Sequence, residues 1–326
     1  MHWLKSLYPE VRKTLSDSVP DYWPELRDIL GKLFEEPIIP EAMLPLASCK
    51  AVNGNPKDAV HVSAALLAMG MSVRIFDDLF DQDKSGELWE QVGPERTWNY
   101  AAVIHNLSFE ILNRAPLHHD IRQKINQCII DSFFCLAAGQ DRDISGITKT
   151  IEEYWQTIEM KSGNIYATAC AAGAIAGAGN DDLVHACGVF GHHLGLTIQI
   201  FNDMESIWLP RGITDLKQGK ITLPLLYGLT KEHPEKDELK SLVSSNQVAS
   251  HSERIKEILD NIDTKTFLIW AALKEREQAL EAISACPDME GRKALESFIT
   301  GMFGDIDSLI PKTQAGEIIR AEIKKN

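Results

Sequence analysis

Apolar residues recur at spacings of three and four along most of the chain, which is the period of an α-helix. Stretches with this pattern run roughly over residues 58–82, 96–113, 118–138, 148–178, 181–208, 220–231, 251–285 and 288–303. Strands would require alternation of β-branched or aromatic residues with polar ones, and no convincing window of the sequence alternates in this way. Prolines and glycines fall mostly between the periodic stretches, where helix breakers belong. The pattern therefore predicts an all-α protein.

The organisation of the chain is expected to be simple. Its 326 residues would allow two domains by length alone, although large helical domains also reach this size. No segment has the composition of a flexible linker, and no fixed repeat or low-complexity stretch is present in the sequence. We therefore expect residues 1–326 to form a single α-helical domain.

The stretch over residues 58–82 carries apolar residues on two sides of the predicted helix, which is typical of a buried helix. It ends in D-D-L-F-D, so that Asp77, Asp78 and Asp81 lie at the edge of a core. Two unit charges ~4 Å apart repel by about 4 kcal/mol at an effective dielectric constant of about 20. Such a group requires a bound cation or free access to water. Taken alone, it also describes an ordinary solvated acidic helix end.

A second apolar stretch, residues 195–208, also ends in polar residues. Gln199 and Asp203 are four residues apart, as are Asn202 and Ser206. Oxygen ligands at this spacing suit Mg²⁺, which takes one or two carboxylates together with waters and substrate phosphates. By itself, this segment is more typical of an ordinary polar helix terminus.

Lysines and an arginine accompany the two polar clusters in the sequence. Lys161 precedes a helix rich in Ala and Gly, while Arg211 and Lys220 follow the second cluster. Cations within reach of carboxylate-held metal ions would complete a diphosphate site. The alternative for Lys161 is a surface side chain that extends along the helix into water.

Composition and charge narrow the possible partners and compartments. A formal net charge of −14 leaves no broad basic surface, which argues against nucleic acid as a partner. The six cysteines form no C-x-x-C pair and no regular framework, which argues against a zinc site or a disulfide scaffold and favours a reducing compartment. The N-terminus lacks the order of a secretory signal, and the stretch over residues 167–179 is too short for a transmembrane segment. We predict a cytoplasmic protein.

Four motifs occur in a fixed order: D-D-L-F-D at 77–81, K-S-G at 161–163, Q-I-F-N-D at 199–203 and D-L-K-Q-G-K-I-T-L-P-L-L at 215–226. In this order they resemble the trans-isoprenyl diphosphate synthase (polyprenyl synthetase) family, with similarity from about residue 50 to 230. The resemblance implies the class I isoprenoid synthase fold, in which helices surround a deep central cavity. It also implies an allylic prenyl diphosphate as substrate, about three Mg²⁺ ions and a homodimer.

The same resemblance implies roles for individual residues. Those matching the metal-binding positions are Asp77, Asp78, Asp81, Asn202, Asp203 and Ser206. Those matching positions that bind the substrate diphosphate are Lys161, Gln199, Arg211 and Lys220. Asp77, Asp78, Asp81, Lys161 and Asp203 are the expected catalytic residues. Ser72 and Val73 are small where short-chain members carry bulky residues, which favours a prenyl tail of about fifteen or twenty carbons.

Two departures from the family pattern affect the expected acceptor. The stretch over residues 36–49 contains no Lys or Arg, although chain-elongating members hold isopentenyl diphosphate with basic residues there. The arginine pair expected after the first motif is also missing from residues 84–93. The segment G-Q-D-R-D-I at 139–144 is similar to one in members that prenylate a tryptophan of a peptide.

We therefore expect Mg²⁺-dependent ionisation of an allylic prenyl diphosphate and transfer of the prenyl group to a peptide or small molecule. One alternative is a terpene synthase that cyclises a C15 or C20 diphosphate, because Asn202 and Ser206 are similar to part of a cyclase motif whose last acid is replaced by Pro210. The sequence is also compatible with a conventional farnesyl or geranylgeranyl diphosphate synthase and with a non-catalytic partner subunit of a synthase.

Overall fold

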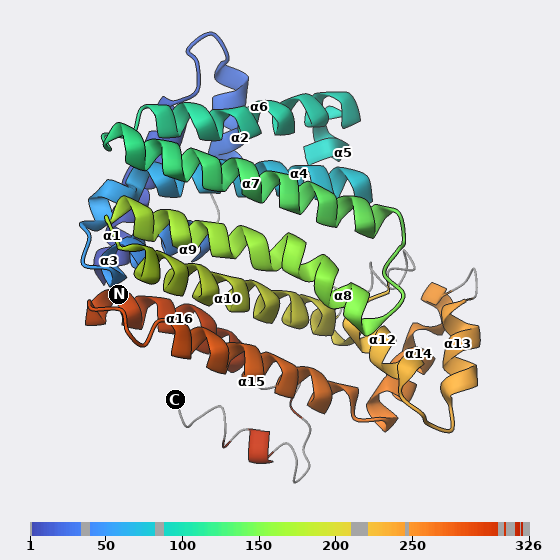
Figure 1. The fold of residues 1–326 in the computed structure, drawn as a ribbon. Helices are drawn as coiled ribbons and strands as arrows, with labels where there is room; N and C mark the ends of the chain where they lie inside the picture. Colours follow the sequence, from blue (N-terminus) through green and yellow to red (C-terminus); the bar gives the residue numbers. More distant parts are fainter. Residues whose placement is uncertain are drawn as a thin grey trace. The chain divides into compact units, whose positions relative to one another are not determined.

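The computed structural model of the chain describes residues 2–33, 40–81, 88–209, 221–244 and 248–305, together with residues 310, 317–319 and 321. All regular structure in these described segments is helical, without a strand (Figure 1). The all-α prediction is confirmed.

Helices follow one another along the described chain with short connections. Their bounds are α1 (His2–Asp17), α2 (Pro24–Leu33), α3 (Leu44–Ala51), α4 (Val60–Asp81), α5 (Leu88–Val92), α6 (Pro94–Asn113), α7 (His119–Ile144), α8 (Ile151–Ile158), α9 (Asn164–Ala176), α10 (Asp181–Trp208), α12 (Leu223–Thr230), α13 (Lys236–Val243), α14 (Ser252–Asn261), α15 (Thr264–Ala282) and α16 (Met289–Asp305). Three short 3₁₀ turns, Pro40–Met43, Pro56–Ala59 and Val248–His251, and one π-helical turn, Glu159–Gly163, complete the set.

Two of the predicted helical stretches are interrupted in the structure. The stretch over residues 148–178 contains the π-helical turn between α8 and α9. The stretch over residues 251–285 is divided between α14 and α15 at Asp263, which has a positive φ of 59°. An apolar period detects the buried faces of helices, but it does not detect a local change in winding.

The chain divides into two compact units. Unit 1 comprises residues 1–133, 165–191 and 282–296, and unit 2 comprises residues 134–164, 192–281 and 297–326. The expected single domain stays a prediction.

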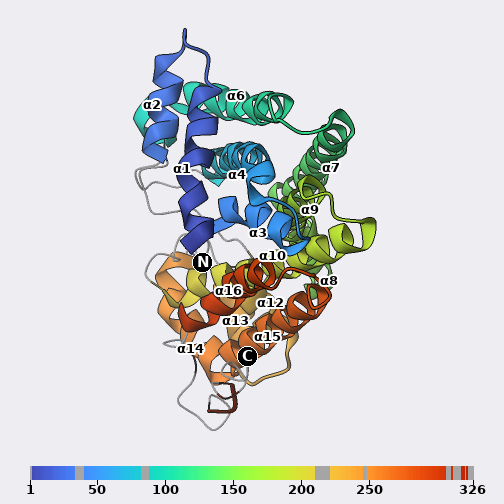
Figure 2. The same ribbon diagram turned by 90° about the vertical axis from the view of Figure 1, so that its left-hand side faces the viewer.

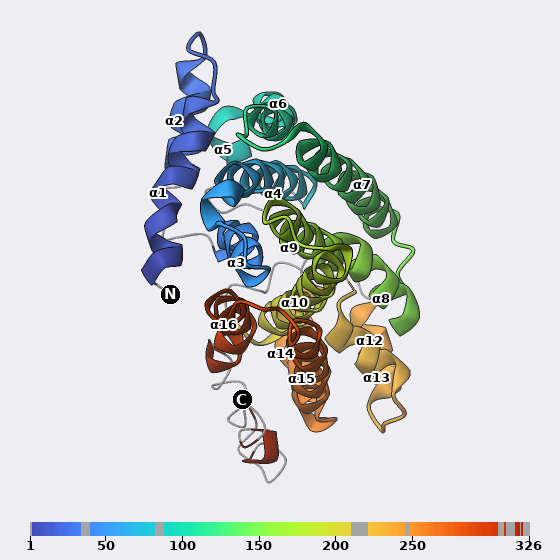
Figure 3. The same ribbon diagram turned by 60° about the vertical axis from the view of Figure 1, so that its left-hand side comes forward.

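In unit 1, α4 is the central helix. It packs along α6 and against α1, and Figure 2 shows its contact with α1. Figure 3 shows α6 and α9 on different sides of α4. Val62, Ala65 and Met69 are fully buried, and the buried Ser72 hydroxyl donates to the Ala101 carbonyl oxygen of α6 at 2.8 Å. These contacts confirm that the helix predicted over residues 58–82 is a buried one.

By length and composition, the segment Pro56–Phe80 would be long and apolar enough to cross a membrane. In the structure, 72% of its most apolar window is buried inside the protein. Its hydrophobicity is therefore accounted for by the helices that surround it.

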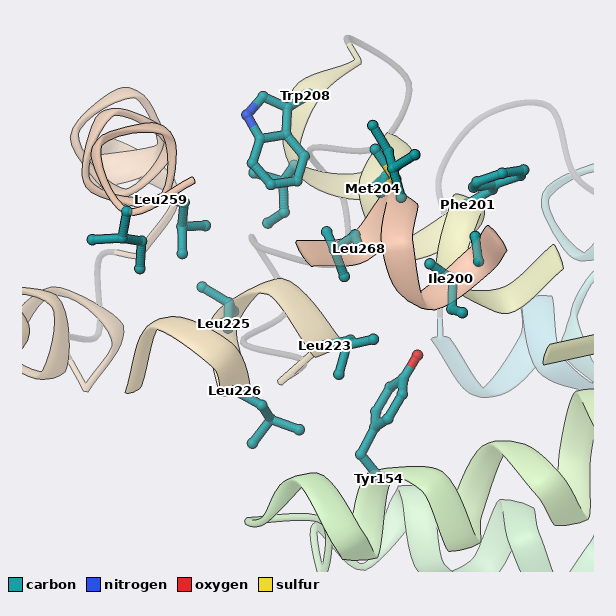
Figure 4. Close-up of a cluster of buried hydrophobic side chains, with 14 of the residues drawn as sticks. Tyr154, Ile200, Phe201, Met204, Trp208, Leu223, Leu225, Leu226, Leu259 and Leu268 are labelled. Atoms are coloured by element: carbon teal, nitrogen blue, oxygen red, sulfur yellow. The ribbon is translucent and has the colours of Figure 1, made fainter. Parts of the chain in front are cut away.

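Unit 2 has its own apolar core, formed by residues of α8, α10, α12, α14 and α15 (Figure 4). Ile200 and Met204 of α10 are fully buried beside Leu223 and Leu225 of α12. The indole of Trp208 donates to Asp260 at 2.8 Å, so that the end of α10 is also held by a polar contact. Two members of the second polar cluster, Asp203 and Ser206, are buried.

The close approach of α9 to α3 in unit 1 generates a stability prediction. A Cβ added to Gly173 would collide with the backbone of Pro45, whereas one added to Gly301 of α16 would meet open space. We expect Gly173→Ala to lower the free energy of unfolding by about 1–3 kcal/mol through overpacking. The control Gly301→Ala should raise it by about 0.5–1 kcal/mol, because alanine favours a helix. Urea denaturation measures both changes, and an unchanged Gly173→Ala would contradict this packing.

Candidate functional site

The first acidic motif lies at the end of α4 in unit 1, beside an apolar cavity of about 500 Å³. Helices α4, α5 and α9 supply most of its wall. The apolar lining residues from these helices are Leu66, Leu67, Gly70, Met71, Ile75, Leu88, Trp89, Ile165 and Ala169. A cavity of this size and composition suits a large apolar group.

Charged side chains also reach the wall of this cavity. Asp78, from the last turn of α4, lines it together with Arg74 one turn earlier and Lys32 of α2. Asp77 and Asp78 are both half-buried. Unit 1 therefore combines an apolar chamber with a carboxylate on its wall. The side chain of Asp81 lies outside the described residues.

The open position on the α4 wall is Gly70 and not the expected pair, Ser72 and Val73. Neither of those two residues is among the lining residues of the cavity, and Ser72 faces α6. Gly70 lines the cavity, and a Cβ placed on it would have no atom within 4 Å. The cavity lies on the face of α4 that carries Met71 and Arg74. Each of these residues is adjacent in sequence to Ser72 or Val73, and neighbouring residues of a helix point about 100° apart.

Lys161, in unit 2, lies within the π-helical turn between α8 and α9. Its ammonium is 2.6 Å from the carboxylate of Asp143, and both side chains remain partly exposed, at 24% and 38%. Single π-helical turns occur frequently at functional sites. The contact with Asp143 means that an anion reaching Lys161 would compete with a carboxylate.

The second polar cluster forms a chain of hydrogen bonds inside unit 2. The Ser162 hydroxyl donates to Gln199 Oε1 at 2.8 Å, and Gln199 Nε2 donates to Asp203 Oδ1 at 2.8 Å. Asp203 Oδ2 accepts from the Tyr154 hydroxyl and from the backbone N–H of Leu223, each at 2.8 Å. Figure 4 shows Tyr154 projecting from α8 towards Leu223.

The structure differs here from the expectation that Asp203 and Ser206 face a bound ion. Asp203 is only 3% exposed, and Ser206, equally buried, donates its hydroxyl to the Asp203 carbonyl oxygen at 2.7 Å. Asn202 is the exposed member of the predicted ligand set in this segment. The physical reason is helical phase, because Asp203 shares its face of α10 with the buried Leu196 and Ile207. The metal-binding roles of these residues stay predictions.

Burial and the neighbouring carboxylate act together on Tyr154. Desolvation raises the pKa of its hydroxyl well above the usual value, and the negative charge of Asp203 raises this pKa further. The hydroxyl therefore keeps its proton at neutral pH and acts as a hydrogen-bond donor to Asp203.

Arg211 and Lys220, the other two predicted diphosphate contacts, lie outside the described residues. Within the described residues, His, Cys, Asp and Glu form no group of three or more that could hold a metal ion. Asp77 and Asp78 still fit Mg²⁺, because this ion is commonly held by one or two carboxylates and completes its shell with water and phosphate oxygens. The donor chemistry at the end of α4 is therefore suitable for the ion.

Two contributions to these regions were not anticipated from the sequence. Tyr154 and Asp143 have partners distant in the chain, and no local motif indicates such contacts. Trp89, eight residues after Asp81, also lines the cavity. The burial of Asp203 did have a signal, since a helical projection of α10 places it among apolar residues.

Comparisons with known proteins were made on the whole chain. A family model described as polyprenyl synthetase matches residues 42–262, about two thirds of the chain. The chain is 27% identical over 303 residues to the short chain isoprenyl diphosphate synthase of Methanothermobacter thermautotrophicus, covering 87% of this chain and 91% of the relative. It is 26% identical over 174 residues to the tryptophan prenyltransferase ComQ of Bacillus subtilis, covering 52% of this chain and 54% of that protein.

A solved structure, geranylgeranyl pyrophosphate synthetase from Pyrococcus horikoshii, matches with a TM-score of 0.81 at 19% sequence identity. The match covers 91% of this chain and 96% of the solved one. It confirms the expected class I isoprenoid synthase fold.

The ion pair of Lys161 yields a prediction about anion binding. Asp143→Asn should change the free energy of unfolding by less than about 1 kcal/mol, because partly exposed ion pairs contribute little. It should tighten the binding of inorganic pyrophosphate up to about fivefold, since Lys161 no longer has to leave a carboxylate. Isothermal titration measures the affinity. Asp237→Asn, which alters the exposed pair with Lys240, should leave the affinity unchanged. Equal affinities in both variants would show that Lys161 receives no diphosphate.

Proposed function

The chain belongs to the polyprenyl synthetase family and is a prenyltransferase, and we propose that it transfers the prenyl group of an allylic diphosphate to an acceptor other than isopentenyl diphosphate. The observation that carries the substrate half of this proposal is the cavity of unit 1, where Asp78 lies on an otherwise mostly apolar wall. An allylic diphosphate has the matching construction, with a charged head and an apolar tail.

Asp77 and Asp78 would hold Mg²⁺ at the end of α4, and Asp81 is proposed as a third ligand from the same motif. When bound, the ion supplies positive charge that stabilises the departing diphosphate. The number of ions, expected to be three, stays a prediction. So do the homodimer, the cytoplasmic location and the predicted roles of Lys161, Gln199, Asn202, Arg211 and Lys220.

The apolar wall serves the reaction in two ways. Leu67, Met71 and Ile75 bind the prenyl tail and exclude the water that would otherwise capture an allylic cation. Trp89 presents an aromatic ring to the same space, and aromatic faces attract cations by electrostatics. Ionisation and protection of the cation therefore occur in one chamber.

The proposed acceptor follows from the missing basic residues. Residues 36–49 lack Lys and Arg, and a second diphosphate would be poorly bound without charge-assisted hydrogen bonds. A neutral nucleophile, such as an aromatic ring of a peptide or a small molecule, has no such requirement. The similarity to a tryptophan prenyltransferase supports an acceptor of this kind.

A conventional isoprenyl diphosphate synthase is the second candidate. It is favoured by the relative with the longer match, the short chain isoprenyl diphosphate synthase, which aligns with 87% of the chain. The two candidates differ in what they do with isopentenyl diphosphate, and this difference can be measured directly.

The first prediction of the proposed function concerns isopentenyl diphosphate. The protein is incubated with Mg²⁺ and C10, C15 or C20 allylic diphosphates, each with and without isopentenyl diphosphate, and both pyrophosphate and lipid products are analysed. We expect slow pyrophosphate release that isopentenyl diphosphate does not accelerate, and faster release when a tryptophan-containing peptide or indole is supplied. Longer prenyl diphosphates would establish the conventional synthase instead. Hydrocarbons from one substrate alone would establish cyclisation.

In the same assay, Asp77→Asn should lower kcat about a hundredfold or more, because one charge that holds the ion is removed. Helicity and thermal stability should be retained. Asp120→Asn, an exposed carboxylate in the first turn of α7, is the matched control and should be fully active. Full activity of Asp77→Asn would exclude this end of α4 from the reaction.

Gly70 provides a prediction about the length of the prenyl tail. Position 70 lines the cavity and a Cβ there meets no atom within 4 Å, so we expect Gly70→Leu to place its side chain in the cavity and to leave the fold intact. We expect kcat/KM for the C20 substrate to fall about tenfold relative to that for the C10 substrate, because the tail loses room. Gly301→Leu, on the exposed part of α16, should leave the ratio unchanged. A ratio unaffected by Gly70→Leu would place the tail elsewhere.

A further inference from the structure

Four hydrogen bonds form a connected set in unit 2, and three of them join segments that lie far apart in the sequence. They run from Ser162 to Gln199, from Gln199 to Asp203, and from both Tyr154 and the Leu223 amide to Asp203. Each is 2.8 Å long. The carboxylate of Asp203 is therefore the point at which α8, α10 and α12 are joined.

We infer that Asp203 is a positioning residue of the prenyltransferase, which fixes Gln199, Ser162 and the start of α12, and that it is not a ligand of the ion. This inference rests on the proposed function for its catalytic consequence. The motif suggests that Asp203 binds an ion, whereas its observed hydrogen bonds support a role in holding neighbouring residues in place.

The carboxylate determines the direction of the hydrogen-bond chain. An ionised carboxylate only accepts hydrogen bonds, so the Gln199 amide must present its NH₂ group to Asp203. The amide oxygen then faces Ser162, whose hydroxyl must donate. Ser162 follows Lys161 within the π-helical turn. The hydrogen bond from Ser162 to Gln199 therefore holds the backbone next to that lysine. An amide at position 203 could offer either a donor or an acceptor, and this direction would no longer be determined.

The same carboxylate replaces a local cap at the start of α12. Thr222, the N-cap residue, makes no side-chain capping hydrogen bond, and Pro224 has no N–H to offer. The N–H of Leu223 is buried with its residue, and Asp203 is its acceptor. Leu223 lies three positions after Lys220, a predicted diphosphate contact, in the sequence. Asp203 therefore fixes the first residue of α12, close in sequence to that lysine.

The observed contacts and the burial of Asp203 leave little of its carboxylate for an ion. Asp203 Oδ2 already accepts two hydrogen bonds and Oδ1 accepts one, in a side chain that is 3% exposed. Three of the roughly four lone-pair positions of this carboxylate are thus taken, and turning Oδ2 towards an ion would leave the N–H of Leu223 and the hydroxyl of Tyr154 without an acceptor. Leaving a buried donor unsatisfied is strongly unfavourable.

Asp203→Asn tests the inference, with Asp77→Asn as the matched variant. Hydrogen exchange of the Leu223 amide and the stoichiometry of bound Mn²⁺, measured by electron paramagnetic resonance, are followed in each protein. For Asp203→Asn we expect exchange at Leu223 to accelerate roughly tenfold or more, with unchanged Mn²⁺ stoichiometry and a lower kcat. For Asp77→Asn we expect the reverse, lost Mn²⁺ and an unchanged Leu223. Unchanged exchange in Asp203→Asn with one Mn²⁺ fewer would overturn the inference.

The wild-type protein gives a second test that does not depend on the folding of a variant. If Asp203 turned Oδ2 towards an ion, saturating Mn²⁺ would draw this oxygen from the Leu223 amide and accelerate exchange there. We expect exchange there to stay the same or to slow. If the wild type binds no Mn²⁺ at all, the proposed function fails, but the effect of Asp203→Asn on Leu223 still decides whether this carboxylate holds α12.

Discussion

A carboxylate at the wall of an apolar cavity loses part of its hydration, and α4 holds Asp78 in such a position. The first half of the helix is buried and packs against α6 and α1, which holds its half-buried acidic end beside the chamber. The partial loss of hydration, together with a second carboxylate at Asp77, favours binding of a cation at this end. The charge of such a cation in turn attracts an anionic head group, while the chamber accepts an apolar tail. The chemistry of unit 1 thus follows from the burial of one helix.

In unit 2, the side chain of Lys161 already has a carboxylate partner. Lys161 is paired with Asp143, as is reasonable in a chain whose formal net charge is −14. A partly exposed pair contributes little to stability, so exchanging the carboxylate for a diphosphate oxygen would cost little free energy. The π-helical turn displaces Lys161 and Ser162 from regular helical positions, and Ser162 is held there by Gln199. Local winding and one hydrogen bond therefore set where this lysine can reach.

Much of the fold could be predicted from the hydrophobic pattern, since a period of 3.6 residues identifies helices wherever one face is buried. The two apolar stripes of the stretch over residues 58–82 correctly indicated a helix buried on several sides. The π-helical turn and the break at Asp263 could not be predicted in this way, because neither interrupts the apolar pattern. The site was predicted less completely than the fold. A motif names residue types at given spacings, but the direction of each side chain depends on which neighbours cover the helix, and this is why Asp203 lies inside and Gly70 opens into the cavity.

The shared fold and the proposed uncharged acceptor can be reconciled by considering charge. Ionisation of an allylic diphosphate requires positive charge around the leaving group, whatever captures the cation, so the first acidic motif must be kept in any member that performs this step. Capture has no such requirement when the nucleophile is neutral, because a ring or a double bond needs only apolar contact and exclusion of water. Basic residues in the stretch over residues 36–49 would then be a disadvantage, since they would be desolvated beside an apolar acceptor without an anion to pair with. Their absence from this sequence is therefore consistent with a protein that keeps the ionising half of its family's chemistry and directs the cation to an uncharged partner.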